Sequence, residues 1–197
     1  MACFGFLMAQ CHKETTSFEA TVKGKILEID SDVPIPNITV KLIELDYDAS
    51  AWNPPRTVVQ KTQSDATGAY QLTYTSVKGR GYEVAAYANS TDYYDNIKTE
   101  PVPDGKSSTV NISLIPLGWL KVHFKNVNPF DERDEVGSAF GGFIGNKVDT
   151  TIVLQLGGSK KYVRPVRIWT TRNGLQTFKD IGVITPPHDT TKLDIFY

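Results

Sequence analysis

The feature that most constrains this chain is a hydrophobic period of two, which begins after residue 17. In "FEATVKGKI", residues 18–26, apolar side chains share one parity and charged side chains the other, as in a strand with one buried face. The alternation recurs in "NITVKL", "AYQLTYT", "YEVAAYA" and "TVNISL", and later in "LKVHFKN" and "LDIFY". Because no segment offers a sustained helical stripe, we expect an all-β fold with little or no helix.

The strand pattern is interrupted once in a way that predicts a domain boundary. Pro116 and Gly118 break the alternation in "IPLGWL". A chain of 197 residues can form two small domains, each with its own core. We therefore expect a tether at residues 1–17, an antiparallel Ig-like β-sandwich at 18–116, and a second sandwich-like unit at 117–197.

Two short stretches predict specific turns. In "SDATGAYQL", Asp65 suits the first position of a type I turn, and Gly68 suits the left-handed position that follows. In "TRNGLQ", Asn173 and Gly174 both tolerate the positive φ of a two-residue type I′ hairpin turn. The register of that hairpin would place Trp169 opposite Phe178 and Arg167 opposite Asp180.

The N-terminus carries an export signature. "FGFLMAQCHKETTS" resembles the end of a bacterial lipoprotein signal, in which an apolar run precedes a cysteine that is lipidated. Cys11 would be that cysteine, although Gln10 stands where the family prefers a small residue. An ordinary secretory leader is the alternative. The resemblance implies a cell-envelope protein, anchored to the outer membrane and either periplasmic or surface-exposed.

The first half resembles a known sandwich family. "VKGKILE", "PIPNITVKLIE" and "TQSDATGAYQL" follow one another as do the motifs of transthyretin-like, or carboxypeptidase regulatory-like, domains. The resemblance implies a structural or binding module without catalytic residues of its own, and it covers only the first half. The motif positions are filled by Gly24, Pro34, Pro36, Val40, Asp65, Gly68 and Tyr70.

Charge and residue spacing exclude several classes of function. The 21 basic and 22 acidic residues leave a net charge of -1, which gives no electrostatic footprint for nucleic acid. His12, His123 and His188 lack the spacing of a zinc site, and we expect each to be satisfied or solvent-exposed. "VGSAFGG" and "GGFIG" lack the spacing of a nucleophile elbow and of a dinucleotide loop. We expect no catalytic residue, metal site or cofactor.

An acidic run in the second half raises the question of calcium. Arg133 interrupts this run, and the ligand alternation of a calcium loop is missing. A solvated loop is therefore the favoured interpretation. The run consists of Asp131, Glu132, Asp134 and Glu135.

Aromatic residues in two loops are the candidates for ligand binding. Their rings can stack on sugars while neighbouring carboxylates accept hydrogen bonds, or they can simply cap the core of the sandwich. If consecutive strands run up and down, the two loops fall at opposite ends, with the second loop beside "SDATG". The candidate residues are Tyr47 and Trp52 in one loop, and Asp92, Tyr93, Tyr94 and Asp95 in the other.

These observations favour one function over two others. We expect a non-enzymatic cell-envelope lipoprotein that acts as a structural or binding accessory module. Its partners would be the membrane, through the lipid, and a glycan or an envelope protein. The alternative is a carbohydrate-binding module of a glycan-uptake or degradation system. An enzyme ranks third, because no acid, base and nucleophile come together.

Overall fold

The computed structural model describes residues 16–50, 52–94 and 96–197. Within these ranges the regular secondary structure consists of fifteen strands and no helix, as the alternation predicts. None of the described segments is thus a helix long and apolar enough to cross a membrane. Cys11 and Asp95 lie outside the described residues.

The first eight strands form two sheets that face each other. One sheet has the order β4-β1-β7, with β8 also paired to β1, and the other has the order β3-β2-β5-β6. The strands are β1 (Ser17–Glu28), β2 (Thr39–Leu45), β3 (Arg56–Gln63), β4 (Ala69–Val77), β5 (Gly81–Tyr87), β6 (Ile97–Pro101), β7 (Ser107–Thr109) and β8 (Ile112–Leu114).

Five strands of this first sandwich bury the face that the alternation predicts. The alternating apolar residues of β1, β2, β4, β5 and β8 meet in a single core, so the period of two correctly gives the inward direction. Phe18 is only partly buried, because it lies at the start of β1. The core includes Val22, Ile26, Val40, Leu42, Tyr70, Leu72, Val84, Ile112 and Leu114.

The last seven strands form a second sandwich. Its sheets have the orders β11-β10-β13-β14 and β12-β9-β15. Leu120, Val122 and Phe124 of β9 lie in its core, as the alternation predicts. The strands are β9 (Leu117–Lys125), β10 (Glu135–Ser138), β11 (Gly141–Ile144), β12 (Asp149–Gly157), β13 (Arg164–Arg172), β14 (Leu175–Val183) and β15 (Thr190–Phe196).

Three pairings are parallel within these otherwise antiparallel sheets. β1 pairs in parallel with β7 and with β8, and β15 pairs in parallel with β9. Side-chain alternation is the same whichever way a neighbouring strand runs, so the sequence pattern carries no signal for strand direction. These three pairings place a late strand of each unit beside its first strand.

The "SDATG" segment is the predicted turn between β3 and β4. Asp65 Oδ1 accepts the backbone N–H groups of Thr67 at 2.8 Å and of Ala69 at 3.0 Å. Gly68 has the expected positive φ of 72°. The hydrogen bond from the Thr67 hydroxyl, followed by those from the backbone N–H groups of Thr67 and Ala69, lowers the pKa of the Asp65 carboxyl.

The "NG" hairpin between β13 and β14 is also confirmed. Asn173 and Gly174 have φ values of 48° and 72°, as a type I′ turn requires. Arg167 lies opposite Asp180, and its Nε and Nη2 donate to the two carboxylate oxygens at 2.8 Å each. Trp169 lies opposite Phe178, with its ring over Gly137 of β10, where no Cβ intervenes.

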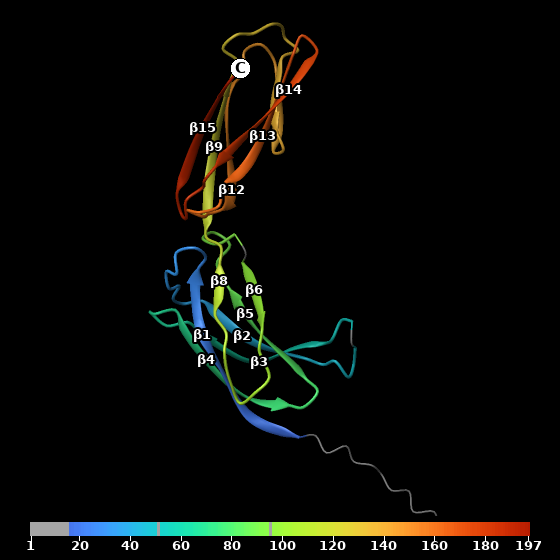
Figure 1. The fold of residues 1–197 in the computed structure, drawn as a ribbon, viewed down its shortest axis with the longest axis vertical. Coiled ribbons are helices and arrows are strands. Elements are labelled where there is room, and N and C mark those ends of the chain that lie inside the picture. Colours follow the sequence, from blue (N-terminus) through green and yellow to red (C-terminus); the bar gives the residue numbers. More distant parts are fainter. Residues whose placement is uncertain (1–15, 51, 95) are drawn as a thin grey trace, which may run out of the picture.

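The two sandwiches are arranged end to end (Figure 1). β1 begins at the far end of the first sandwich and runs toward the second, and β9 continues away from β8 (Figure 1). In the described part of the chain, no strand of β1–β8 belongs to a sheet with a strand of β9–β15. The domain boundary after residue 116 stays a prediction, since pairing alone does not show that either half folds independently.

Candidate functional site at the junction of the two sandwiches

The two loops that carry the candidate aromatic residues lie at opposite ends of the first sandwich. The ring of Tyr47 packs on Gly81, the first residue of β5. Tyr93 lies in the loop that follows Tyr87, the last residue of β5. The predicted separation of the two loops is therefore correct, and they cannot line one cleft.

The loop between β5 and β6 holds the segment that connects the two sandwiches. Tyr94 N–H donates to the carbonyl of Ile115 at 2.8 Å, and Leu117 N–H donates to the carbonyl of Asp92 at 2.9 Å. From the second sandwich, Gly158 N–H donates to the carbonyl of Pro116 at 2.6 Å. We call this region the junction: residues 115–116 with the loops at 88–94, 158–163 and 184–189.

Tyr93 is a structural ring in the junction. It is half-buried, packs against the core of the first sandwich, and contacts the ring of His188 edge-on at 6.0 Å between centroids. Burial, with a smaller contribution from the carboxylates of Glu28 and Asp92, raises the pKa of Tyr93 to about 12. This placement matches the core-capping alternative considered for the loop aromatics.

Two polar contacts join the sandwiches across the junction. Glu28 Oε1 lies 2.7 Å from His188 Nε2, and Ser159 Oγ donates to Asp30 Oδ2 at 2.5 Å. Glu28 and Ser159 are both buried. Sequence reasoning missed these residues because the partners are 160 and 129 positions apart and belong to no recognisable motif.

A hollow of about 340 Å³ opens beside these contacts. Arg164 on its wall lies over the ring of Tyr162, 5.2 Å from its centroid, and Nη2 donates to the carbonyl of Gly157 at 3.0 Å. Tyr94 lies close by, with Cγ 3.7 Å from where a Cβ on Gly157 would be. The hollow is lined by Ile29, Asp30, Ile115, Gly158, Ser159, Lys161, Tyr162 and Arg164.

The hollow combines a mainly apolar lining with a few polar and aromatic side chains. Tyr94 and Tyr162 are 56% and 57% exposed, so both rings are accessible from solvent. Arg164 and Lys161 supply hydrogen-bond donors, while Asp30 supplies carboxylate oxygens. Ring faces beside such groups suit a hydroxylated ligand the size of one or two sugar rings.

The remaining candidate residues stay apart from this hollow. Asp92 is exposed in the junction loop, and its carbonyl already accepts the N–H of Leu117. Trp52 is 99% exposed at the opposite end of the first sandwich. No contact of Trp52 with the hollow is possible from there, and a ligand at Tyr47 or Trp52 stays a prediction.

His123 pairs with two carboxylates on an exposed sheet face. Its Nε2 lies 2.8 Å from Asp149 Oδ1, and its Nδ1 lies 3.2 Å from Asp194 Oδ1. The hydrogen bonds to Asp149 and then Asp194 raise the pKa of His123. Because both ring nitrogens face carboxylates, neither is free to act as a general base.

The acidic run of the second sandwich does not converge on one point. Asp131 accepts hydrogen bonds from its neighbour Arg133, whereas Asp134 is fully buried and accepts from Asn126 Nδ2 at 2.9 Å and Phe130 N–H at 2.7 Å. The expected solvated loop thus contains one carboxylate that organises it from within. Among the described residues no three His, Cys, Asp or Glu side chains are placed to hold a metal ion.

Comparison with known proteins assigns no family. No family model matches the chain, and no curated protein matches it. Among solved structures, the shaft pilin SpaA from Lactobacillus rhamnosus GG is 9% identical, with a TM-score of 0.37 over 92% of this chain and 97% of that one. The minor pilin GBS52 from Streptococcus agalactiae is also 9% identical, with a TM-score of 0.41 over 90% and 94%.

Proposed function

We propose that this chain is a non-enzymatic cell-envelope lipoprotein that serves as a structural or binding accessory module. The observation that carries the proposal is the end-to-end arrangement of the two sandwiches (Figure 1). The contacts Glu28–His188 and Asp30–Ser159 tie them together at the junction. β1 begins at the end farthest from the second sandwich (Figure 1). A lipid on the preceding tether would therefore leave the second sandwich pointing away from the membrane.

The first sandwich is proposed to be a transthyretin-like, or carboxypeptidase regulatory-like, domain. The motif residues have physical roles that support this assignment. Gly24 leaves room for the carbonyl of Val110, which accepts the Tyr70 hydroxyl at 2.6 Å. Asp65 and Gly68 form the turn into β4. These four motif residues, Gly24, Asp65, Gly68 and Tyr70, organise the fold, which is consistent with a module that has no catalytic role.

The lipid anchor can be tested because the chain offers a matched pair of cysteines. The full chain, expressed in a bacterial host, is fractionated and its mass is measured by mass spectrometry. We expect the wild type and Cys3→Ser to be recovered with membranes and to carry a lipid, whereas Cys11→Ser is soluble and unmodified. Two or three acyl chains on one cysteine bury enough methylene groups to give stable membrane attachment. An unmodified Cys11 in the wild type would overturn the lipoprotein proposal.

A second candidate function is carbohydrate binding at the junction hollow. The observation that favours it is the opening of about 340 Å³ lined by Tyr162, Arg164 and Asp30, with Tyr94 nearby, beside Gly157. Stacking on both tyrosine rings would contribute most of the affinity. A glycan ligand would belong to the uptake or degradation system that the module accompanies.

This candidate is tested by polysaccharide pull-down and a glycan array. We expect Tyr162→Ala to weaken retention, since it removes a ring from the wall of the hollow, and Tyr94→Ala to weaken it as well, since it removes the exposed ring beside Gly157. Trp52→Ala is the matched control, because it removes an exposed ring at the far end of the first sandwich. Retention that is lost with Trp52→Ala and kept by both tyrosine variants would place the glycan elsewhere.

A further inference from the structure

The two sheets of the second sandwich differ in their number of strands. One has four strands, β11-β10-β13-β14, and the other has three, β12-β9-β15. In the described part of the chain, β14 pairs only with β13, and β15 pairs only with β9. The outer edges of both strands are thus free, and the three-stranded sheet has no strand opposite β14.

The inward face of β14 is uncovered as a result. Residues directly opposite each other on paired strands share a face. Lys179 lies opposite Ile168, which is buried in the core, so Lys179 points inward, and Thr177 and Leu175 continue the same parity. All three are nevertheless exposed, Leu175 at 72%. Residues that face inward and are still exposed to solvent indicate that a strand is missing from the opposite sheet of the sandwich.

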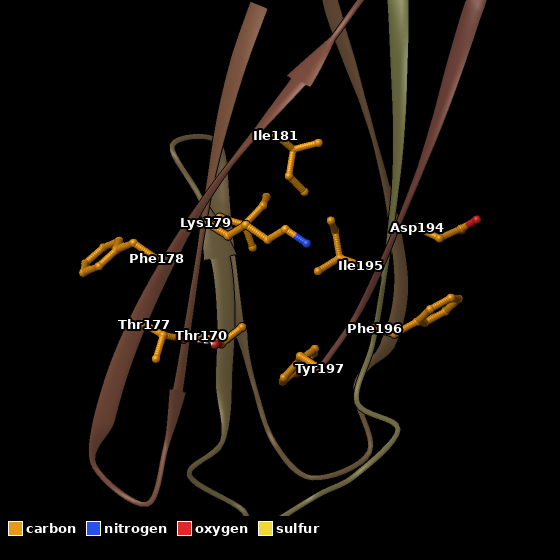
Figure 2. A pocket seen from close by; sticks show the side chains of 10 residues that line it. Thr170, Thr177, Phe178, Lys179, Ile181, Asp194, Ile195, Phe196 and Tyr197 are labelled. Atoms are coloured by element: carbon orange, nitrogen blue, oxygen red, sulfur yellow. Dashed lines mark hydrogen bonds between the residues drawn. The ribbon is translucent and has the colours of Figure 1, made fainter.

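A hollow of about 390 Å³ occupies this place between β14 and β15. Figure 2 shows Lys179, Ile181 and Ile195 pointing toward one another across it, while Phe178 and Phe196 point away on opposite sides. Lys179 forms no ion pair with any described residue. Asp194 also lines the hollow, but its side chain points away from Lys179 and pairs with His123 (Figure 2). The hollow therefore combines apolar and polar walls, two free strand edges and a lysine without an ion-pair partner among the described residues.

We propose that this hollow accepts an extended β-strand from an envelope protein, which adds to the free edge of β15 and covers the inward face of β14. Main-chain hydrogen bonds to an edge give affinity, and alternate side chains give specificity. The alternate side chains of the bound strand would face Ile181, Lys179, Thr177 and Leu175. In that order, we expect them to be apolar, acidic, hydroxyl-bearing and apolar. This inference deepens the binding role proposed above and rests on it.

Lys179 sets the chemistry of the partner. A purely apolar strand would bury the Lys179 ammonium without a counter-ion, which is strongly unfavourable. An inward-facing charge on an edge strand also discourages indiscriminate strand pairing. The same side chain thus favours a strand with a correctly placed carboxylate and rejects others.

The proposal is tested with a synthetic peptide and the purified full chain. The probe is a capped, fluorescently labelled peptide whose alternate residues are Val, Glu, Thr and Val, with Thr between them. A second peptide has Lys in place of Glu, and a third has Pro at one intervening position, which removes an edge hydrogen-bond donor. Fluorescence anisotropy measures binding to the wild type, Lys179→Glu and Lys192→Glu. Lys192→Glu is the control, because it makes the same charge change on the outer face of β15.

The expected result is a reciprocal charge swap. The Glu peptide binds the wild type with a Kd below about 1 mM, roughly tenfold tighter than the Lys peptide. Lys179→Glu reverses the order of the two peptides, Lys192→Glu keeps it, and the Pro peptide fails to bind the wild type. Equal binding of all three peptides, or binding of none, would overturn the proposal. So would sedimentation showing that the free chain dimerises through this edge.

The outcome is separable from that of the proposed function. Peptide binding is measured on purified protein and does not depend on Cys11. Lipidated Cys11 without peptide binding would overturn only the strand-docking inference. Peptide binding without lipidation would overturn only the membrane anchor.

Discussion

At the scale of single residues, glycines and turn carboxylates fix the backbone of the first sandwich. Gly24 lies where β1 passes the segment after β7, and a Cβ there would meet the carbonyl oxygen of Val110. That carbonyl is held by the Tyr70 hydroxyl, so neither group can move aside cheaply. The close contact explains why a glycine interrupts the alternation of β1.

The first prediction follows from this contact. Gly24→Ala should destabilise the protein by about 3 kcal/mol, because it forces backbone apart in a packed core. Gly142→Ala in β11 is the matched control, since a Cβ there would make only ordinary contacts near 3.5 Å. Urea denaturation measures both. A Gly24→Ala variant as stable as the control would contradict the assigned role of Gly24.

Residue-level prediction from the sequence succeeded where the chemistry is local. Asp65 and Gly68 were predictable because a turn is decided by four or five neighbouring residues. Tyr93 and Tyr94 were not distinguishable in the same way. They are adjacent in the sequence, yet the ring of Tyr93 packs on the core and the ring of Tyr94 faces solvent. Only the packing of the junction decides which of the two rings is buried.

At the scale of strands, His123 connects three strands of the second sandwich. It lies on β9, with Asp149 of β12 on one side and Asp194 of β15 on the other. Lys125 also reaches Asp149, at 2.8 Å. The protonated imidazole thus tethers both neighbours of the central strand.

The second prediction concerns pH. The pKa of His123 is raised in the folded state, so its contribution to stability is fully present below its unfolded pKa of 6.5 and is lost as pH rises through the folded pKa. Chemical denaturation at about pH 6 and pH 9 should show this loss in the wild type and a smaller loss in His123→Gln. The same fall in both proteins would show that His123 does not act as this tether.

Strand-level prediction was good for faces and hairpins and poor for partners. The "NG" turn set the β13–β14 register correctly, because two residues determine it. The parallel pairing of β15 with β9 and the unequal sizes of the two sheets had no such signal. Both depend on which distant strands pair, which alternation within a strand does not encode.

At the scale of the whole molecule, the junction makes two sandwiches into one elongated body (Figure 1). The contacts Glu28–His188 and Asp30–Ser159 add to backbone hydrogen bonds that hold residues 115–117 from both sides. None of this was predictable from motifs. The partners come from loops that become neighbours only after both sandwiches have formed.

The third prediction concerns coupling between the sandwiches. Glu28→Ala and His188→Ala should each lower stability, with a coupling energy of about 1 kcal/mol in a double-mutant cycle. Scanning calorimetry should show one transition in the wild type and two in the double variant. The pair Arg56–Glu83, which lies within the first sandwich, is the control. Its removal should lower stability without splitting the transition, and splitting there would argue against a special role of the junction.

We infer that the chain is one stiff body, which would hold an anchored end apart from a binding edge. The most direct test is the distance between spin labels on cysteines introduced at Gln71 in β4 and Gln155 in β12, with Cys3 and Cys11 replaced by serine. Both glutamines are exposed. We predict a single narrow distance distribution from double electron–electron resonance. A broad distribution would contradict the claim, because it would mean that the two sandwiches move independently.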